Sequence, residues 1–238
     1  DEAVHRGLRV NNGKISTEEF LRRTDIPLKK VPWIPNGFYY DEESCNPAKD
    51  ADYYAGLYYL QEPSAMTPAS RLPIEPDDRV LDLCAAPGGK ATELGSRIGE
   101  GGMLLANDIS NSRAKALLRN LEIQGVGRLL VTSEDPEKLV TLYPAFFDKI
   151  LLDAPCSGEG MFRKESSMLR YYSENGPEHY VPIQKKLIEQ AYQMLAEGGE
   201  LLYVYLYVFC KGERRGHRRA AGCASGYGSA GNYPGLRR

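Results

Sequence analysis

The sequence has no cysteine pattern that would cross-link it. Its five cysteines are odd in number and none stands in a Cys-x-x-Cys pair, which argues against a disulfide framework and against a zinc site. No apolar run is long enough to span a bilayer, and no basic segment followed by an apolar one opens the chain as in a signal peptide. These absences predict a reduced, cytoplasmic protein without a bound metal and without membrane contact.

The sequence also lacks a strong overall charge. The net charge is −2 over 238 residues, of which 42% are hydrophobic and 26% charged, and this composition fits one main globular domain with a sizeable core. The charge is uneven, because residues 211–238 carry a net +6 and leave −8 for the remainder. A basic tail is typical of RNA or DNA contact. Because the chain begins at Asp1 rather than at a methionine, we expect a fragment or a processed chain.

Hydrophobic periodicity separates a mixed N-terminal part from a regular core, in which apolar runs alternate with amphipathic helical segments. Strands are predicted at residues 79–84, 103–107, 128–132, 148–153 and 200–209. Helices are predicted at residues 90–98, 110–124, 135–142 and 181–196, with Ser110 as a cap and Gly198-Gly199 as the final stop signal. The alternation predicts an α/β fold, a Rossmann-like doubly wound and mostly parallel sheet. We expect an α+β lobe at residues 1–71, this core at 72–209 and a tail at 210–238.

Within the N-terminal lobe, Gly7–Val10 is a candidate strand and Ser16 a candidate helix cap. Four tyrosines follow, at positions 53, 54, 58 and 59. Such a cluster could stack on nucleic-acid bases. The alternative, which we favour for most of them, is that they pack this lobe onto the next.

The stretch Val80–Lys90 reads as a strand, a tight turn of small residues and the start of a helix. Gly88 and Gly89 allow close backbone approach, and the helix start offers free amide groups to an anionic or nucleotide ligand. Glycine spacing here does not follow G-x-G-x-x-G, which disfavours a nicotinamide dehydrogenase.

Three carboxylates follow successive predicted strands: Asp108, Asp135 and Asp153. In a doubly wound sheet, ligands bind outside the carboxyl ends of the strands, where an acid after the second strand can accept both ribose hydroxyls. An acid after the third could accept an adenine amino group. Any one of these residues could instead be an ordinary helix cap. Three of them beside a glycine turn favour a nucleoside site.

A further candidate is Cys156, in a polar, glycine-punctuated loop close to Arg163 and Lys164. Neighbouring cations lower the pKa of a thiol and make it a nucleophile, whereas a cysteine on an apolar face is usually inert packing. The loop setting favours a functional thiolate at Cys156.

Together, Asp82–Lys90 and Asp153–Gly160 resemble the Sun family of RNA (cytosine-5) methyltransferases, in its bacterial ribosomal-RNA branch of the RsmF type. The segment Leu60–Met66 and the Arg163-Lys164 pair fit the same branch. The resemblance runs from about Arg6 to Tyr203 and implies a class I methyltransferase fold.

The resemblance implies S-adenosylmethionine as methyl donor. Its methionine end would be held by Cys84, Ala85, Ala86, Pro87, Gly88, Gly89 and Lys90. Asp108 would bind the ribose, Asp135 the adenine, and Asp153 would lie between donor and target base. The substrate would be RNA, ribosomal or, alternatively, transfer RNA, contacted in part by the N-terminal lobe.

In this family a cysteine thiolate attacks ring carbon 6 of a flipped-out cytosine, which makes carbon 5 nucleophilic enough to take the methyl group. A second cysteine in a Pro-Cys motif, matched by Pro155-Cys156, assists product release. The attacking cysteine belongs to a Ser-Thr-Cys-Thr motif, and here Leu206 stands in its place. Cys210 lies four residues further on, beyond the required position. We therefore expect donor binding without turnover.

A reading-frame slip after Tyr203 accounts for this departure. Permitted codons for Val204–Cys210, read one base later, give Ser-Thr-Cys-Thr-Phe-Ser, and the gene's DNA sequence tests the idea. Residues 211–238 contain no Ile, Val, Phe or Met, so we expect a disordered tail with accidental charge rather than an RNA-binding tail. The last strands of the sheet would then be missing, which leaves residues 201–209 as an unprotected edge.

Two other functions use the same fold. An amino-group methyltransferase needs an acid or amide beside paired prolines and an aromatic, whereas Asp153 is followed by Ala154-Pro155-Cys156. A catalytically silent RNA-binding protein is favoured by Leu206 if the sequence is genuine, and restoring cysteine there would discriminate between the two.

Overall fold

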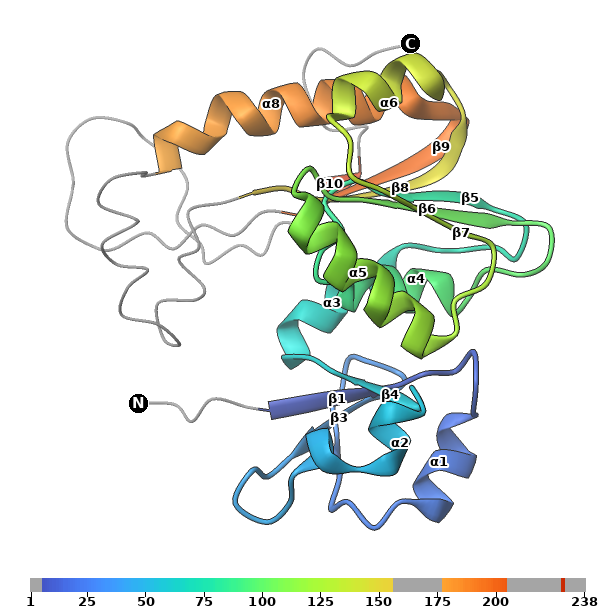
Figure 1. The fold of residues 1–238 in the computed structure, drawn as a ribbon, viewed down its shortest axis with the longest axis vertical. Coiled ribbons are helices and arrows are strands. Elements are labelled where there is room, and N and C mark those ends of the chain that lie inside the picture. Colours follow the sequence, from blue (N-terminus) through green and yellow to red (C-terminus); the bar gives the residue numbers. More distant parts are fainter. Residues whose placement is uncertain (1–5, 156–176, 205–227, 230–238) are drawn as a thin grey trace.

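The computed structural model describes residues 6–155, 177–204 and 228–229. Two sheets are stacked along the long axis of the molecule (Figure 1), a small one formed by the N-terminal residues and a larger one formed by the rest. Within the described residues, no helix is both long and apolar enough to cross a membrane.

The small sheet is antiparallel, with strand order β2-β3-β1-β4. Its elements are β1 (Arg6–Val10), α1 (Thr17–Arg23), β2 (Lys29–Lys30), β3 (Gly37–Tyr40), the 3₁₀ turn η1 (Pro47–Lys49), α2 (Ala51–Tyr54) and β4 (Tyr58–Leu60). Ser16 caps α1 as predicted, because its hydroxyl accepts a 3.1 Å hydrogen bond from the Glu19 amide.

The four tyrosines behave differently from one another. Tyr53 and Tyr58 join the core of the small lobe, so the prediction that they pack onto the next domain is wrong. Tyr54 is 67% exposed. Tyr59 alone faces the larger domain, where its ring approaches Gly89. Aromatic rings thus supply much of the volume of the lobe's core beside its aliphatic side chains.

The large sheet has the order β10-β9-β8-β5-β6-β7, and the five strands from β9 to β7 are parallel. The predicted doubly wound α/β architecture is therefore confirmed. Its elements are α3 (Pro63–Arg71), β5 (Arg79–Asp82), α4 (Gly89–Gly95), β6 (Met103–Asn107), α5 (Asn111–Gln124), β7 (Leu129–Thr132), α6 (Pro136–Leu142), β8 (Phe147–Asp153), α8 (Pro177–Met194), β9 (Leu195–Val204) and β10 (Gly228–Ser229).

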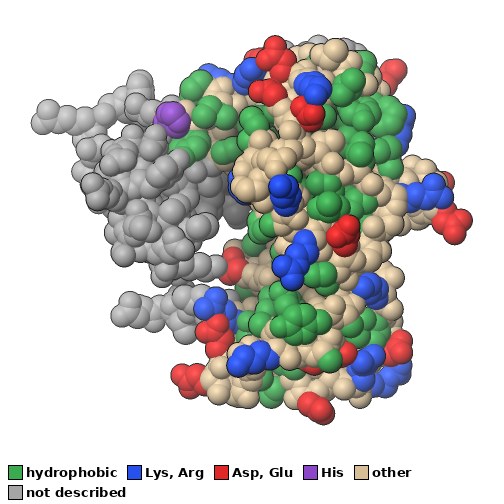
Figure 2. Space-filling model, in the orientation of Figure 1, with side chains coloured by type: hydrophobic (Ala, Val, Ile, Leu, Met, Phe, Trp, Pro, Cys, Tyr) green, Lys and Arg blue, Asp and Glu red, His purple; other side chains and the backbone are tan. Residues whose placement is uncertain are grey.

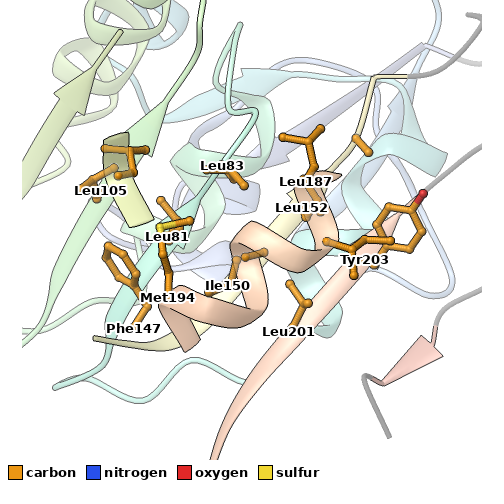
Figure 3. Close-up of a cluster of buried hydrophobic side chains, with 14 residues drawn as sticks. Leu81, Leu83, Leu105, Phe147, Ile150, Leu152, Leu187, Met194, Leu201 and Tyr203 are labelled. Atoms are coloured by element: carbon orange, nitrogen blue, oxygen red, sulfur yellow. The ribbon is translucent and has the colours of Figure 1, made fainter. Parts of the chain in front are cut away.

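Helices cover both faces of this sheet. On one face lie α6 and α8, and on the other lie α3, α4 and α5, between the sheet and the small lobe (Figure 1). Alternate residues along β5 and just after it serve opposite faces. Leu81 and Leu83 join the cluster under α8, drawn in Figure 3, while Val80 joins the cluster under α4 and α5. Burial on both faces explains why these strands read as continuous apolar runs.

The last helix ends earlier than predicted. It stops at Met194, and the chain enters β9 at once. The carbonyl groups of Gln193 and Met194 accept hydrogen bonds from the amides of residues 145 and 146, so pairing with the neighbouring segment replaces the last helical turn. The Gly198-Gly199 pair is therefore not the helix stop; Gly198 has φ +75° and forms an irregularity inside β9.

The edge strand β9, which was predicted to have no neighbouring strand, is paired over two residues. Gly228 and Ser229 of β10 pair antiparallel with Tyr203 and Leu202 of β9. The prediction of an unprotected edge is wrong there, because strand pairing uses the backbone and needs no apolar side chain. The other residues of the predicted tail lie outside the described residues.

Candidate functional site

Chain order reverses between β5 and β8, and the carboxyl ends of β5, β6 and β8 meet at one edge of the large sheet. The register aligns Asp82 with Ala106 on one side and with Leu151 on the other. Asp108 follows the end of β6, and Asp153 ends β8. Three carboxylates thus gather at a position where open α/β sheets bind ligands.

The loop between β5 and α4 is held in place by hydrogen bonds from neighbouring elements. The Ala85 amide donates to the Asn107 carbonyl at 2.8 Å. Two side chains of α5 hold loop carbonyls, Arg113 that of Ala86 at 2.9 Å and Asn120 that of Pro87 at 2.7 Å. The loop is therefore held by hydrogen bonds from β6 and α5.

Glycine is required at the junction of this loop with α4. Gly88 caps the helix with φ +114°, a conformation that residues with a side chain rarely adopt. At Gly89, an added Cβ would lie 2.9 Å from Nε2 of Gln61. The glycine pair in the sequence thus serves a left-handed cap and a close contact with the small lobe.

Asp82 is a residue of this edge to which sequence reasoning assigned no separate role. Its side chain is fully buried. The Cys84 amide lies close enough to favour the carboxylate, yet among the described residues neither oxygen has a partner with hydrogen-bond geometry. Burial raises the pKa of Asp82 to about 7, against the opposing effect of Lys90. The signal available in the sequence was a carboxylate between an apolar run and the glycine turn.

Cys84, in the predicted cofactor loop, has a neutral thiol. Burial, with added repulsion from Asp82 and Asp153, raises the pKa of Cys84 to about 12. A thiol in this environment is a small apolar group and not a nucleophile. Any covalent chemistry must come from another cysteine.

Asp108 is held rigidly at the end of β6. It is 3% exposed, accepts the Ser110 amide at 3.0 Å, and pairs with Arg113 at 3.2 Å. Ser110 occupies the cap position of α5 as predicted, but its hydroxyl makes no capping hydrogen bond and lies 3.1 Å from the Ser112 hydroxyl instead. Beside it, Ile109 is 67% exposed and places an apolar surface at the rim.

Asp135 shows the helix-capping role that we weighed against adenine binding. It is the cap of α6, and its carboxylate accepts the Glu137 amide at 2.8 Å. Asp153 pairs instead with Lys90 of α4 at 2.6 Å, which joins the glycine loop to the end of β8. The remaining candidates, Cys156 and the Arg163-Lys164 pair, lie outside the described residues, as do Leu206 and Cys210.

Comparison with known proteins agrees with this geometry. Residues 69–210 match the family described as 16S rRNA methyltransferase RsmB/F, and residues 1–63 match the N-terminal domain of 16S rRNA methyltransferase RsmF. The chain belongs to the RsmB/F family. Among curated relatives, ribosomal RNA small subunit methyltransferase F of Erwinia tasmaniensis is 39% identical over 84% of this chain and 44% of its own length. The enzyme of the same name from Escherichia coli is 37% identical over 84% and 43%.

Solved structures carry the same fold. A methyltransferase homolog from Pyrococcus horikoshii is 31% identical, with a TM-score of 0.71 over 85% of this chain and 64% of its own. NSun6 from the same organism, solved with SFG, has a TM-score of 0.69 at 20% identity over 85% and 76%. The RsmB/F chain described here spans less than half the length of the curated relatives named above.

Proposed function

We propose that this chain carries the donor-binding core of an S-adenosylmethionine-dependent RNA (cytosine-5) methyltransferase that acts on ribosomal RNA in the cytoplasm. The observation that carries the proposal is the meeting of Asp82, Asp108 and Asp153 beside a hydrogen-bonded glycine loop, in a chain of the RsmB/F family. The core would comprise residues 72–209 and the RNA-contacting lobe residues 1–71. A transfer RNA substrate is the alternative within the same reaction class.

The residues present fit S-adenosylmethionine. A sulfonium cation with a ribose and an adenine calls for negative charge, a hydroxyl acceptor and an apolar surface. Asp153 supplies the charge, Asp108 the acceptor, and the exposed Ile109 the surface. The loop from Cys84 to Lys90 would hold the methionine end, and Asp135 the adenine amino group. When bound, the donor supplies an activated methyl group.

On the substrate side, the Lys90–Asp153 pair would position the target base. Asp153 pairs with the Lys90 ammonium group at 2.6 Å, and its carboxylate would accept a hydrogen bond from a cytosine amino group. Cys156, three residues beyond, would assist product release as the Pro-Cys cysteine of the family. A flipped base would reach this edge because the reacting ring atoms are inaccessible inside a stack.

A second candidate rests on Leu206, which stands where the attacking cysteine is expected. Leucine has no lone pair, so the covalent cysteine–cytosine adduct cannot form at that position. On this alternative the chain is a catalytically silent RNA-binding protein on the same fold. Both candidates predict binding of the donor and no turnover by the chain as given, and they differ in whether a cysteine restored at position 206 gives methyl transfer.

The test is a methyl-transfer assay on ribosomal RNA with the chain as given and with Leu206→Cys, beside a donor titration. We expect S-adenosylmethionine to bind to both and methyl transfer to appear only with Leu206→Cys. A restored variant that binds donor and stays inactive would favour the silent protein. Normal activity of the unaltered chain would overturn the role given to position 206.

A further inference from the structure

Arg9 of β1 is a buried arginine that connects the two sheets. It is 2% exposed, although it belongs to the small lobe and its guanidinium reaches the first turn of α4. The helices α3 and α4 lie between the two sheets (Figure 1), so β1 faces α4 across the junction. Arginine is almost never fully buried unless its charge and donors are paired.

Each part of the guanidinium has a partner on or beside α4. Nη1 donates to the Gly89 carbonyl at 2.6 Å and to Oε1 of Gln61 at 2.8 Å. Nη2 donates to the Thr92 hydroxyl at 2.7 Å. Nε lies 2.9 Å from Glu93, a charge contact without hydrogen-bond geometry. Three of these partners, Gly89, Thr92 and Glu93, lie at the start of one helix, which begins where the glycine loop ends.

Gln61, which follows β4, contacts both the Arg9 guanidinium and Gly89. It belongs to the segment Leu60–Met66, which the sequence marked as distinctive and which the proposed function leaves without a role. Its amide nitrogen donates to the Ala65 carbonyl at 3.0 Å and fills the space that a Cβ on Gly89 would need. The space left by the missing side chain at Gly89 is therefore occupied by Gln61 and Tyr59.

The charge of Arg9 is balanced inside the junction. Glu93 is 7% exposed and also accepts the Asn36 amide at 3.2 Å. Burial lowers the pKa of Arg9, while Glu93 opposes that shift, and a guanidinium stays protonated in proteins. The pair is thus an ionic contact shielded from solvent, whose geometry is set by β1, β3 and α4 together.

We propose that Arg9 is a positioning residue: through the Gly89 carbonyl and Thr92 it fixes the start of α4, and so the loop that holds S-adenosylmethionine. The ligand named here rests on the proposed function. Arg9 contacts neither donor nor substrate. Loss of the guanidinium loosens the loop and weakens donor binding, while Asp82, Asp108 and Asp153 remain in place.

The test compares two double variants in the full chain. Arg9→Met with Glu93→Gln removes both charges of the buried pair, because removal of one alone would strongly destabilise the fold. Arg97, which lies 3.9 Å from Glu93, keeps its hydrogen bonds to the carbonyl groups of Leu72 and Ala69. Arg79→Met with Asp148→Asn removes another arginine–carboxylate pair that joins two elements, a more exposed one with contacts of 2.7 and 2.9 Å, at the opposite, amino-terminal edge of the sheet. Calorimetric titration with S-adenosylmethionine and amide hydrogen exchange of residues 88–95 without ligand are measured for both.

We expect the Arg9/Glu93 variant to raise the dissociation constant roughly tenfold, within the range of coupling energies known for such positions, and to exchange faster over residues 88–95. The Arg79/Asp148 variant should match the wild type in both readouts. Arg9→Lys, which keeps the charge but cannot reach Gln61, Gly89 and Thr92 at once, should fall between them. This conservative variant serves if the double variant does not fold.

A wild-type dissociation constant and wild-type exchange in either Arg9 variant would overturn the proposal, since Arg9 would then only support folding. Equal weakening by the Arg79/Asp148 variant would also overturn it. If the wild-type chain does not bind S-adenosylmethionine, the proposed function fails, and hydrogen exchange alone tests the positioning role of Arg9. Faster exchange of residues 88–95 confined to the Arg9 variants supports that role, and unchanged exchange overturns it.

Discussion

Replacing Asp82 by asparagine should change how the stability of this protein depends on pH. The carboxyl group is fully buried without a hydrogen-bond partner, and its pKa is raised from 3.8 to about 7. The folded state therefore holds a proton on Asp82 at pH values where the unfolded chain has released it. Because the folded state binds more protons there, the free energy of unfolding falls as pH rises from about 4 to about 7.

The size of this loss follows from the shift. A difference of roughly three pKa units, at about 1.4 kcal/mol each, corresponds to a loss on the order of 4 kcal/mol above neutral pH. Asparagine has almost the same shape and does not titrate, so Asp82→Asn should lack this loss. The variant should be the more stable protein by a few kcal/mol at about pH 8, and the advantage should vanish near pH 4.

The assay is urea unfolding of wild type and Asp82→Asn at several pH values, and the quantity compared is the difference between the two curves. Asp148→Asn is the control, because hydrogen bonds from Arg79 lower the pKa of Asp148. Its contribution to stability is present at neutral pH and lost as pH falls, which is the opposite trend. A difference between wild type and Asp82→Asn that stays constant with pH would refute the argument.

Further predictions concern the donor, the loop and the small lobe. Asp108→Ala should weaken S-adenosylmethionine binding on calorimetry by roughly tenfold or more, because it removes a fixed charged acceptor, while a retained affinity would exclude a ribose contact. Gly88→Ala should lower thermal stability by about 1–2 kcal/mol, because alanine at φ +114° is strained, and a calorimetric scan measures it. Ser16→Ala should cost about 1 kcal/mol in urea unfolding through loss of the α1 cap, whereas Ser110→Ala, whose hydroxyl makes no capping bond, should cost less; equal costs would contradict this.

The sheet and its site were largely predictable from local patterns. Apolar runs such as Val80–Leu83 are buried on both faces, and in a parallel sheet their carboxyl ends share one edge, which placed Asp108 and Asp153 together. The tight turn at the glycine pair could be predicted because the left-handed backbone at Gly88 tolerates few other residues.

Features set by contacts between distant segments were not predictable. The end of α8 depends on carbonyls that pair with residues 145 and 146, and no local signal marks that choice. The pairing of Lys90 with Asp153 and of Arg9 with Glu93 requires the docking of separate elements. Asp82 looked like part of a motif, and only its burial shows that it is neutral for much of the accessible pH range.

On Figure 2, basic and acidic side chains are interspersed over the described part of the visible face, in keeping with the weak net charge. The proposed function thus depends on the residues of the donor site and not on a general electrostatic attraction to RNA. The most direct measurement is titration of the chain with S-adenosylmethionine beside NAD. We expect saturable one-to-one binding of S-adenosylmethionine, weakened in Asp108→Ala, and no binding of NAD. Absence of donor binding, or binding that is indifferent to Asp108→Ala, would contradict the central claim.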